Sequence, residues 1–309
     1  MEHVVESVRK QAEDCQSLQG FMIYRSISGG TGSGLGSAIL EYISDQFVNK
    51  SKIEIVVSDR LDDGEQAINN TVLASHSMLQ HSDCSFMINN AYLHDICAQI
   101  NAYPSFYNVN TIISQMVSSL TLSMRVDGYM FTSLSNIIEL LVPSPRLLFP
   151  CLSIAPFTPF QSPQQITDLV LKQAHILSTQ NTSKLLSACF LYRGHFIPKE
   201  ISQNLCLRIK QTVRFADVCF SKFSTCIRFG INYQNAANVS KSVVLAEKSV
   251  LFAHNSTDFT FWNKVIDKYE GKQNWNDDET EAIMDLKELK KEYAEMEKEI
   301  EPAEDMNDI

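Results

Sequence analysis

Residues 26–37 read SISGGTGSGLGS, and this stretch decides the fold class of the chain. The apolar run at residues 20–24 (GFMIY) precedes it and is typical of a buried strand. Residues 38–43 (AILEYI) follow it with apolar positions at helical spacing. A strand, a glycine-rich loop and a helix in this order favour phosphate binding, because glycine lets the backbone approach an anion closely and adopt positive φ. The helix then adds free N–H groups and the positive end of its dipole.

The alternative for this segment is a tight glycine-rich turn that binds no ligand. Residues 29–34 contain four glycines that alternate with hydroxyl residues between a strand and a helix, which favours the phosphate site. The pattern is neither of the two common nucleotide signatures. It lacks the lysine of the P-loop and the wider glycine spacing of the dinucleotide fingerprint.

The rest of the first half alternates between strand-like and helix-like segments, which predicts a parallel sheet flanked by helices. The second half predicts a smaller mixed sheet, with helices near 164–177 and 198–212, and ends in an amphipathic helix from Asp278 to about Ile300. In the first half we expect helices at 4–18, 70–81, 90–100 and 109–124, and strands at 20–27, 53–57 and 85–88.

Composition excludes several classes of protein. The net charge of −10 is concentrated from Asp277 onward, where 14 acidic and 4 basic residues leave the body of the chain neutral. We therefore expect an acidic C-terminal tail and no nucleic-acid binding, which would need a basic face. The sequence contains no run of about twenty apolar residues, so it does not predict a membrane-spanning helix. The eight cysteines form no CxxC pair and the seven histidines show no ligand spacing, so we predict reduced thiols in the cytosol and no metal site.

The string GGTGSG at residues 29–34 resembles the phosphate-binding loop of the tubulin superfamily. Residues 81–97 (HSDCSFMINNAYLHDIC) resemble the tubulin segment that carries a base-contacting Asn. Four further blocks are closer to alpha-tubulin than to beta or gamma, although the glycine loop itself is more gamma-like. These blocks are 115–128 (QMVSSLTLSMRVDG), 142–150 (VPSPRLLFP), 188–200 (ACFLYRGHFIPKE) and 229–234 (FGINYQ).

The resemblance implies an α/β fold in three parts. These are a partial nucleotide-binding domain over 1–128, an intermediate mixed-sheet domain over 129–260, and a C-terminal helix with an acidic tail over 261–309. Tubulins carry further residues before the position of Met1, among them the first sheet strand and a loop whose acidic residue helps to hold magnesium. We therefore expect the parallel sheet of the GTP-binding domain to be incomplete and the magnesium loop to be absent. Whether the short N-terminus is natural or an artefact of the gene model stays open.

The resemblance also implies GTP as the ligand and assigns its contacts. Asn90 and Asn110 match the family's two base- or ribose-contacting Asn residues, and helix N-capping is the alternative role for both. Phe106 replaces a Tyr that stacks on guanine. Asn136 replaces the Glu that completes the GTPase site of the neighbouring subunit, so we expect no hydrolysis there; Glu139, one turn on, is a displaced alternative. The phosphate contacts would be Ser26, Gly29, Gly30, Thr31, Gly32 and Ser33.

We therefore expect an alpha-tubulin-like, GTP-binding structural subunit of microtubules with weakened nucleotide binding and impaired hydrolysis. It would pair head-to-tail with a beta-tubulin-like chain in the cytoplasmic cytoskeleton. Two alternatives stay open: a stand-alone cytosolic GTPase and a degenerate copy that does not polymerise. The acidic tail favours the polymer subunit. The short, proline-rich loop at 158–165 and the missing helix between Glu270 and Asp277 favour the degenerate copy, and Trp262 and Trp275 near that deletion are either core anchors or partly exposed.

Overall fold

The structure is a computed structural model that describes residues 1–58, 64–99, 103–125, 133–155, 185–194, 226–231, 248–255, 260–270 and 276–297. The helices expected at 164–177 and 198–212, the loop at 158–165, Trp275 and the acidic tail beyond 297 lie outside the described residues.

The first half of the chain is an alternation of strands and helices, as the sequence predicts. Most elements lie within a few residues of their expected bounds. The elements are α1 (Glu2–Asp14), β1 (Gly20–Ser26), the π-helical turn η1 (Thr31–Leu35), α2 (Gly36–Gln46), β2 (Ser51–Ser58), α3 (Glu65–His81), β3 (Cys84–Asn89), α4 (Asn90–Gln99), α5 (Phe106–Arg125) and α6 (Leu134–Leu141).

The described part of the second half supplies four strands and two helices. These are β4 (Cys151–Ala155), β5 (Leu185–Gly194), β6 (Cys226–Ile231), β7 (Lys248–Asn255), α9 (Thr260–Glu270) and α10 (Asp277–Glu297). The strands form one seven-stranded sheet in the order β1-β2-β3-β4-β7-β5-β6, in which β1 is an edge strand. Strands β1 to β4 pair in parallel, whereas β7 is antiparallel to β4 and β5. The described strands of the second half pair in both directions, as expected, but they continue the sheet of the first half and do not form a separate smaller sheet.

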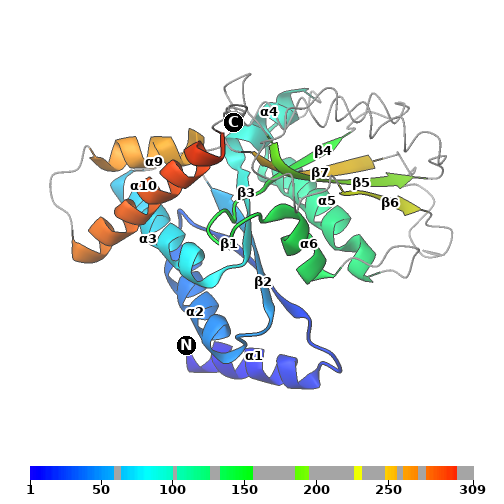
Figure 1. The fold of residues 1–309 in the computed structure, drawn as a ribbon, viewed down its shortest axis with the longest axis horizontal. Coiled ribbons are helices and arrows are strands. Elements are labelled where there is room, and N and C mark those ends of the chain that lie inside the picture. The colour runs from blue at the N-terminus through cyan, green and yellow to red at the C-terminus, as the bar shows by residue number, and fades with distance from the viewer. Residues whose placement is uncertain are drawn as a thin grey trace, which may run out of the picture.

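Helices cover both faces of the β1–β3 part of the sheet (Figure 1). Ile53 and Ile55 of β2 belong to an apolar cluster with side chains of α4, α5 and α6. Val56 belongs to a second cluster with side chains of α3, α9 and α10. Because successive side chains of a strand point to opposite faces, β2 separates two cores in a three-layer α/β/α arrangement.

Two helices begin earlier than apolar periodicity indicates. Helix α3 begins at Glu65, directly after Gly64, whose φ of 100° is reserved for glycine. Helix α5 begins at Phe106, because the Ser105 hydroxyl accepts the Asn108 N–H at 3.3 Å and caps the helix. In both helices the buried side chains appear only a turn or more after the start, so the buried apolar pattern does not mark the first turn.

Trp262 of α9 is an anchor of the second core. Its side chain is buried, and its ring lies 5.2 Å from that of Phe149, centroid to centroid. The alternative that Trp262 is partly exposed is therefore wrong.

Candidate functional site

The glycine segment, residues 29–36, begins to coil immediately beyond β1. Gly30 already has helical φ and ψ of −58° and −41°. The chain passes through η1 into α2, with the Gly36 N–H directed at the carbonyl groups of Thr31 and Ser33. The only described glycine with positive φ is Gly64, so the expectation of positive φ in this segment is wrong. A π-helical turn at a helix start is a feature often found at functional sites.

The glycines of the segment fall into two groups. A Cβ added at Gly32 would lie 2.1 Å from the Ser26 carbonyl oxygen, and one at Gly36 would lie 2.9 Å from Cδ of Arg25. These two glycines are needed for close packing on β1. Among the described residues, a Cβ added at Gly29 or Gly30 meets no atom within 4 Å. Packing therefore does not require glycine at positions 29 and 30, and the open space beside their backbone fits an approaching phosphate.

The hydroxyl residues of the segment differ in orientation. Ser33 is buried, and its Oγ donates to the Gly29 carbonyl oxygen at 2.8 Å. The Ser33 N–H donates to the same oxygen at 3.0 Å. Thr31 is exposed. The Ser33 hydroxyl therefore bonds within the segment, whereas Thr31 is accessible from outside it.

The strand register brings Asn90 to the same edge of the sheet as the glycine segment. Ser26 pairs with Val57, and Ser58 pairs with Asn89 on the next strand. Asn90 begins α4 directly after Asn89. The Asn89 Oδ1 accepts the Ala91 N–H at 2.8 Å, so Asn89 performs the capping role considered for Asn90. Ligands of parallel α/β sheets bind at this carboxyl edge.

Phe106 and Asn110 both lie on α5. Phe106 is the first residue of the helix and is 88% exposed. Asn110 lies one turn later and is exposed, so it does not cap the helix and that alternative is wrong. Helix α5 packs on α4 through an apolar cluster that includes Val109 and Leu93. Phe106 and Asn110 therefore lie on a helix that packs against the helix beginning with Asn90.

Asn136 lies at the opposite end of the sheet. It is in the first turn of α6, and its N–H donates to Ser133 Oγ at 3.2 Å. The neighbouring Ser135 Oγ lies 3.2 Å from Ser51 Oγ, at the start of β2. Since Ser51 pairs with Gly20 at the far end of β1 from Ser26, strand geometry puts Asn136 about 20 Å from the glycine segment. Asn136 therefore does not share a site with that segment within one chain.

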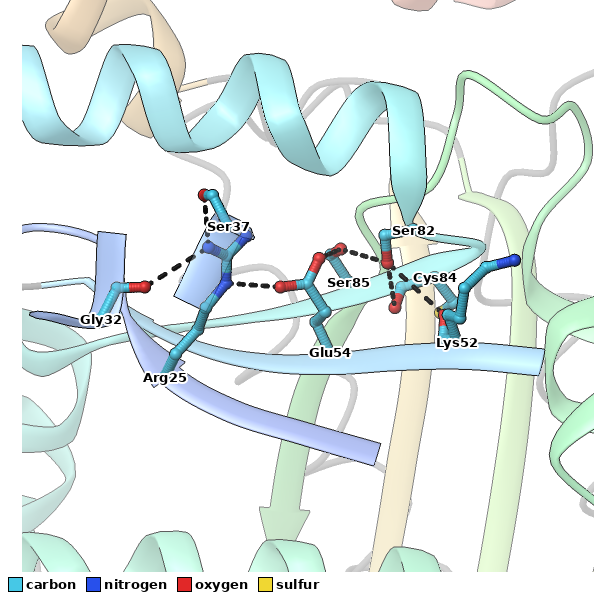
Figure 2. A network of polar contacts seen from close by, with 8 residues as sticks. All are labelled: Arg25, Gly32, Ser37, Lys52, Glu54, Ser82, Cys84 and Ser85. Carbon is cyan, nitrogen blue, oxygen red and sulfur yellow. Dashed lines mark hydrogen bonds and ion pairs between the residues drawn. The ribbon is translucent and has the colours of Figure 1, made fainter. Parts of the chain in front are cut away.

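A buried ion pair beneath the glycine segment is the feature that the sequence analysis missed (Figure 2). Arg25 Nε donates to Glu54 Oε2 at 2.5 Å, and both side chains are at most 2% exposed. Arg25 Nη1 donates to Ser37 Oγ at 2.8 Å and to the Gly32 carbonyl oxygen at 3.3 Å. Burial raises the pKa of the Glu54 carboxyl group, and the Arg25 guanidinium opposes that shift.

A signal for this pair was present in the sequence. Arg25 interrupts the apolar run of β1, and Glu54 stands between Ile53 and Ile55 in β2. Opposite charges inside two adjacent buried strands are rarely left unpaired. The pairing could have been predicted once the parallel register was known.

The described residues hold no group of three or more His, Cys, Asp or Glu side chains arranged to bind a metal ion. Nor does any helix among them have the length and apolar character to cross a membrane.

The architecture and the position of the site are those of an α/β domain that binds a ligand at the carboxyl edge of a parallel sheet. Comparison with known proteins gives the family. The model of the Tubulin/FtsZ family, GTPase domain, matches residues 1–98. The tubulin alpha-8 chain of Caenorhabditis elegans is 32% identical, over 99% of this chain and 73% of the relative.

Two further relatives with similar identity are also alpha-tubulin chains. The tubulin alpha-2 chain of Homarus americanus is 32% identical over 95% of this chain and 70% of its own length. The tubulin alpha chain-like 3 of Mus musculus is 32% identical over 87% and 63%. The chain belongs to the tubulin family, and its similarity is to the alpha-tubulins.

Proposed function

We propose that this chain is an alpha-tubulin-like, GTP-binding structural subunit of microtubules that pairs head-to-tail with a beta-tubulin-like chain in the cytoskeleton. The observation that carries the proposal is the open glycine segment at the carboxyl edge of the parallel sheet, where Gly29 and Gly30 leave room for an anion. The phosphates would lie against residues 29–33 beyond Ser26. Asn90 and Asn110 would contact the base or ribose, and Phe106 would stack on the base.

Nucleotide affinity in this proposal is weaker than in other tubulins. Ser33 already uses its hydroxyl and its N–H on the Gly29 carbonyl, so neither group is available to a phosphate without rearrangement. Phe106 provides a stacking face and no hydroxyl.

Hydrolysis is impaired in this proposal because Asn136 cannot accept a proton from water. The separation of Asn136 from the glycine segment supports a role across an interface: only the glycine segment of a second chain could come close to it. This matches head-to-tail pairing, in which the α6 end of one chain meets the nucleotide end of another.

Co-sedimentation with a beta-tubulin partner in the presence of GTP tests the proposal. We expect the chain to enter the polymer pellet and Asn136→Glu to increase phosphate release. Glu139→Gln on the same helix tests the displaced alternative, because phosphate release that is lost in this variant would assign the role to Glu139. A chain that binds GTP and never enters the pellet would be a stand-alone GTPase. A chain that does neither would be a degenerate copy, and the proposal would be wrong.

A further inference from the structure

The Arg25–Glu54 pair connects four elements at the edge of the sheet that carries the glycine segment. Arg25 is the penultimate residue of β1, and Glu54 lies on β2. Through Nη1 the guanidinium contacts Gly32 of η1 and Ser37 of α2. One side chain thus fixes the first turns of the helix onto two strands (Figure 2).

The contact is close because glycine stands where the helix crosses Arg25. A Cβ at Gly36 would lie 2.9 Å from Cδ of Arg25, so the helix start rests directly on the Arg25 stem. The planar guanidinium donates to Glu54 on one edge and to Gly32 and Ser37 on another. A lysine ammonium has no such fork and could not hold all three partners in this geometry.

The buried pair is a weak source of core stability, because removing two charges from water costs free energy that their attraction only partly offsets. Two charges buried together contribute less to folding than well-packed apolar side chains often do. In addition, Nη2 of Arg25 is buried and has no hydrogen-bond partner among the described residues. Buried polar atoms without a hydrogen-bond partner are uncommon in native proteins, and a functional role is one explanation for them.

We propose that Arg25 is a positioning residue for the nucleotide: paired with Glu54, it holds Gly32 and the first turn of α2 at the sheet edge, in the conformation that receives the phosphates. The statement about nucleotide rests on the proposed function, while the statement about the segment does not. Arg25 itself is covered by the segment and need not touch the ligand. Its effect on affinity passes through the backbone of residues 29–37.

The first experiment measures the segment without any ligand. The double variant Arg25→Met/Glu54→Leu removes both charges together, which avoids leaving either one unpaired in the core. Hydrogen exchange of the peptide covering residues 28–40 should become about tenfold faster, a change of about 1.4 kcal/mol in opening free energy. Exchange in α5 should not change. Equal exchange in the parent and the double variant would overturn the proposal.

Lys52→Met is the matched control. Lys52 is a buried cation on the same strand, its Nζ lies 3.8 Å from Asp83 Oδ2, and Asp83 is 38% exposed and can be hydrated once Lys52 is removed. We expect exchange of residues 28–40 to stay at the parent rate in this variant. Faster exchange would mean that any change of charge on β2 loosens the segment, and the specific role of Arg25 would be wrong.

The second experiment measures GTP affinity by calorimetry, at a temperature at which thermal unfolding shows the parent and each variant to be equally folded. We expect binding about tenfold weaker in the double variant and intermediate in Arg25→Lys, which keeps the charge beside Glu54. A double variant that binds GTP as tightly as the parent would overturn the proposal. If the parent does not bind GTP, the proposed function fails, and the exchange result alone decides whether Arg25 positions the segment.

Discussion

The two faces of the β1–β3 sheet bury different chemistry. On the face covered by α4, α5 and α6 the strands contribute apolar side chains such as Ile53, Ile55 and Phe86. On the face covered by α2 and α3 they contribute apolar residues together with Arg25 and Glu54. The apolar face explains why the sheet is stable. The charged face explains how a glycine-rich helix start, which has few side chains of its own to pack, is held in one place.

The largest expected effect comes from breaking the charged pair on one side only. Arg25→Met leaves the Glu54 carboxylate buried without its counter-charge, which should lower the free energy of unfolding by about 3–5 kcal/mol. The double variant Arg25→Met/Glu54→Leu should recover to within about 1–2 kcal/mol of the parent. Urea unfolding of the three proteins measures this. A single variant as stable as the parent would show that the pair carries no charge–charge coupling.

The pH dependence of the free energy of unfolding in the same variants is a second test of the charged face. Burial raises the pKa of Glu54, so the folded state binds this proton more tightly than the unfolded state. Its contribution to stability is therefore present in acid and is lost as the pH rises from about 4.3 through the raised pKa. In Arg25→Met nothing opposes the shift, and stability should fall by about 1.4 kcal/mol per pH unit above about pH 5.

Other groups around Glu54 set the control for this measurement. Lys52, Asp83 and Cys84 are the nearby titratable side chains, and burial raises the pKa of the Cys84 thiol, which therefore stays protonated. The double variant keeps all three and removes the Glu54 carboxyl group together with its partner Arg25. We expect its stability to lack the decline above about pH 5. The same decline in the double variant would assign the pH dependence to another group.

The smallest effect belongs to the apolar face. Ile55→Val removes one buried methylene, and we expect a loss of about 0.5–1.5 kcal/mol with no dependence on pH. Urea unfolding at two pH values checks both statements. A loss above about 3 kcal/mol, or one that changes with pH, would mean that the two faces are not energetically separate.

Sequence reasoning predicted the elements whose signal is periodic. The strands of the first half and helices α2 to α5 follow from apolar spacing, and GGTGSG marked the segment that we propose as the phosphate site. Helix starts were misplaced at Glu65 and Phe106 because the buried apolar positions begin only a turn or more after each start. The helical conformation from Gly30 was missed because glycine has low helix propensity, and close packing on Ser26 overrides that preference.

The site could be predicted only in part for a related reason. Local motifs name residues, but they do not show which of them share an edge. The strand register places Asn90 beside the glycine segment and Asn136 at the far end. Arg25 and Glu54 are 29 residues apart and meet only through that register. Long-range pairing of this kind is absent from any single window of sequence.

Gly29→Ala tests the central claim, that the glycine segment is a nucleotide phosphate site. An added Cβ at Gly29 meets no atom within 4 Å in the part of the chain that the structure describes, so the variant should fold with the stability of the parent. The methyl group would nevertheless stand where the phosphates approach the backbone. The test measures GTP binding and thermal unfolding of the parent and of Gly29→Ala. The account predicts binding in the parent at about micromolar Kd or weaker, and at least about tenfold weaker in Gly29→Ala at unchanged stability. Equal GTP affinity in the two proteins would contradict it.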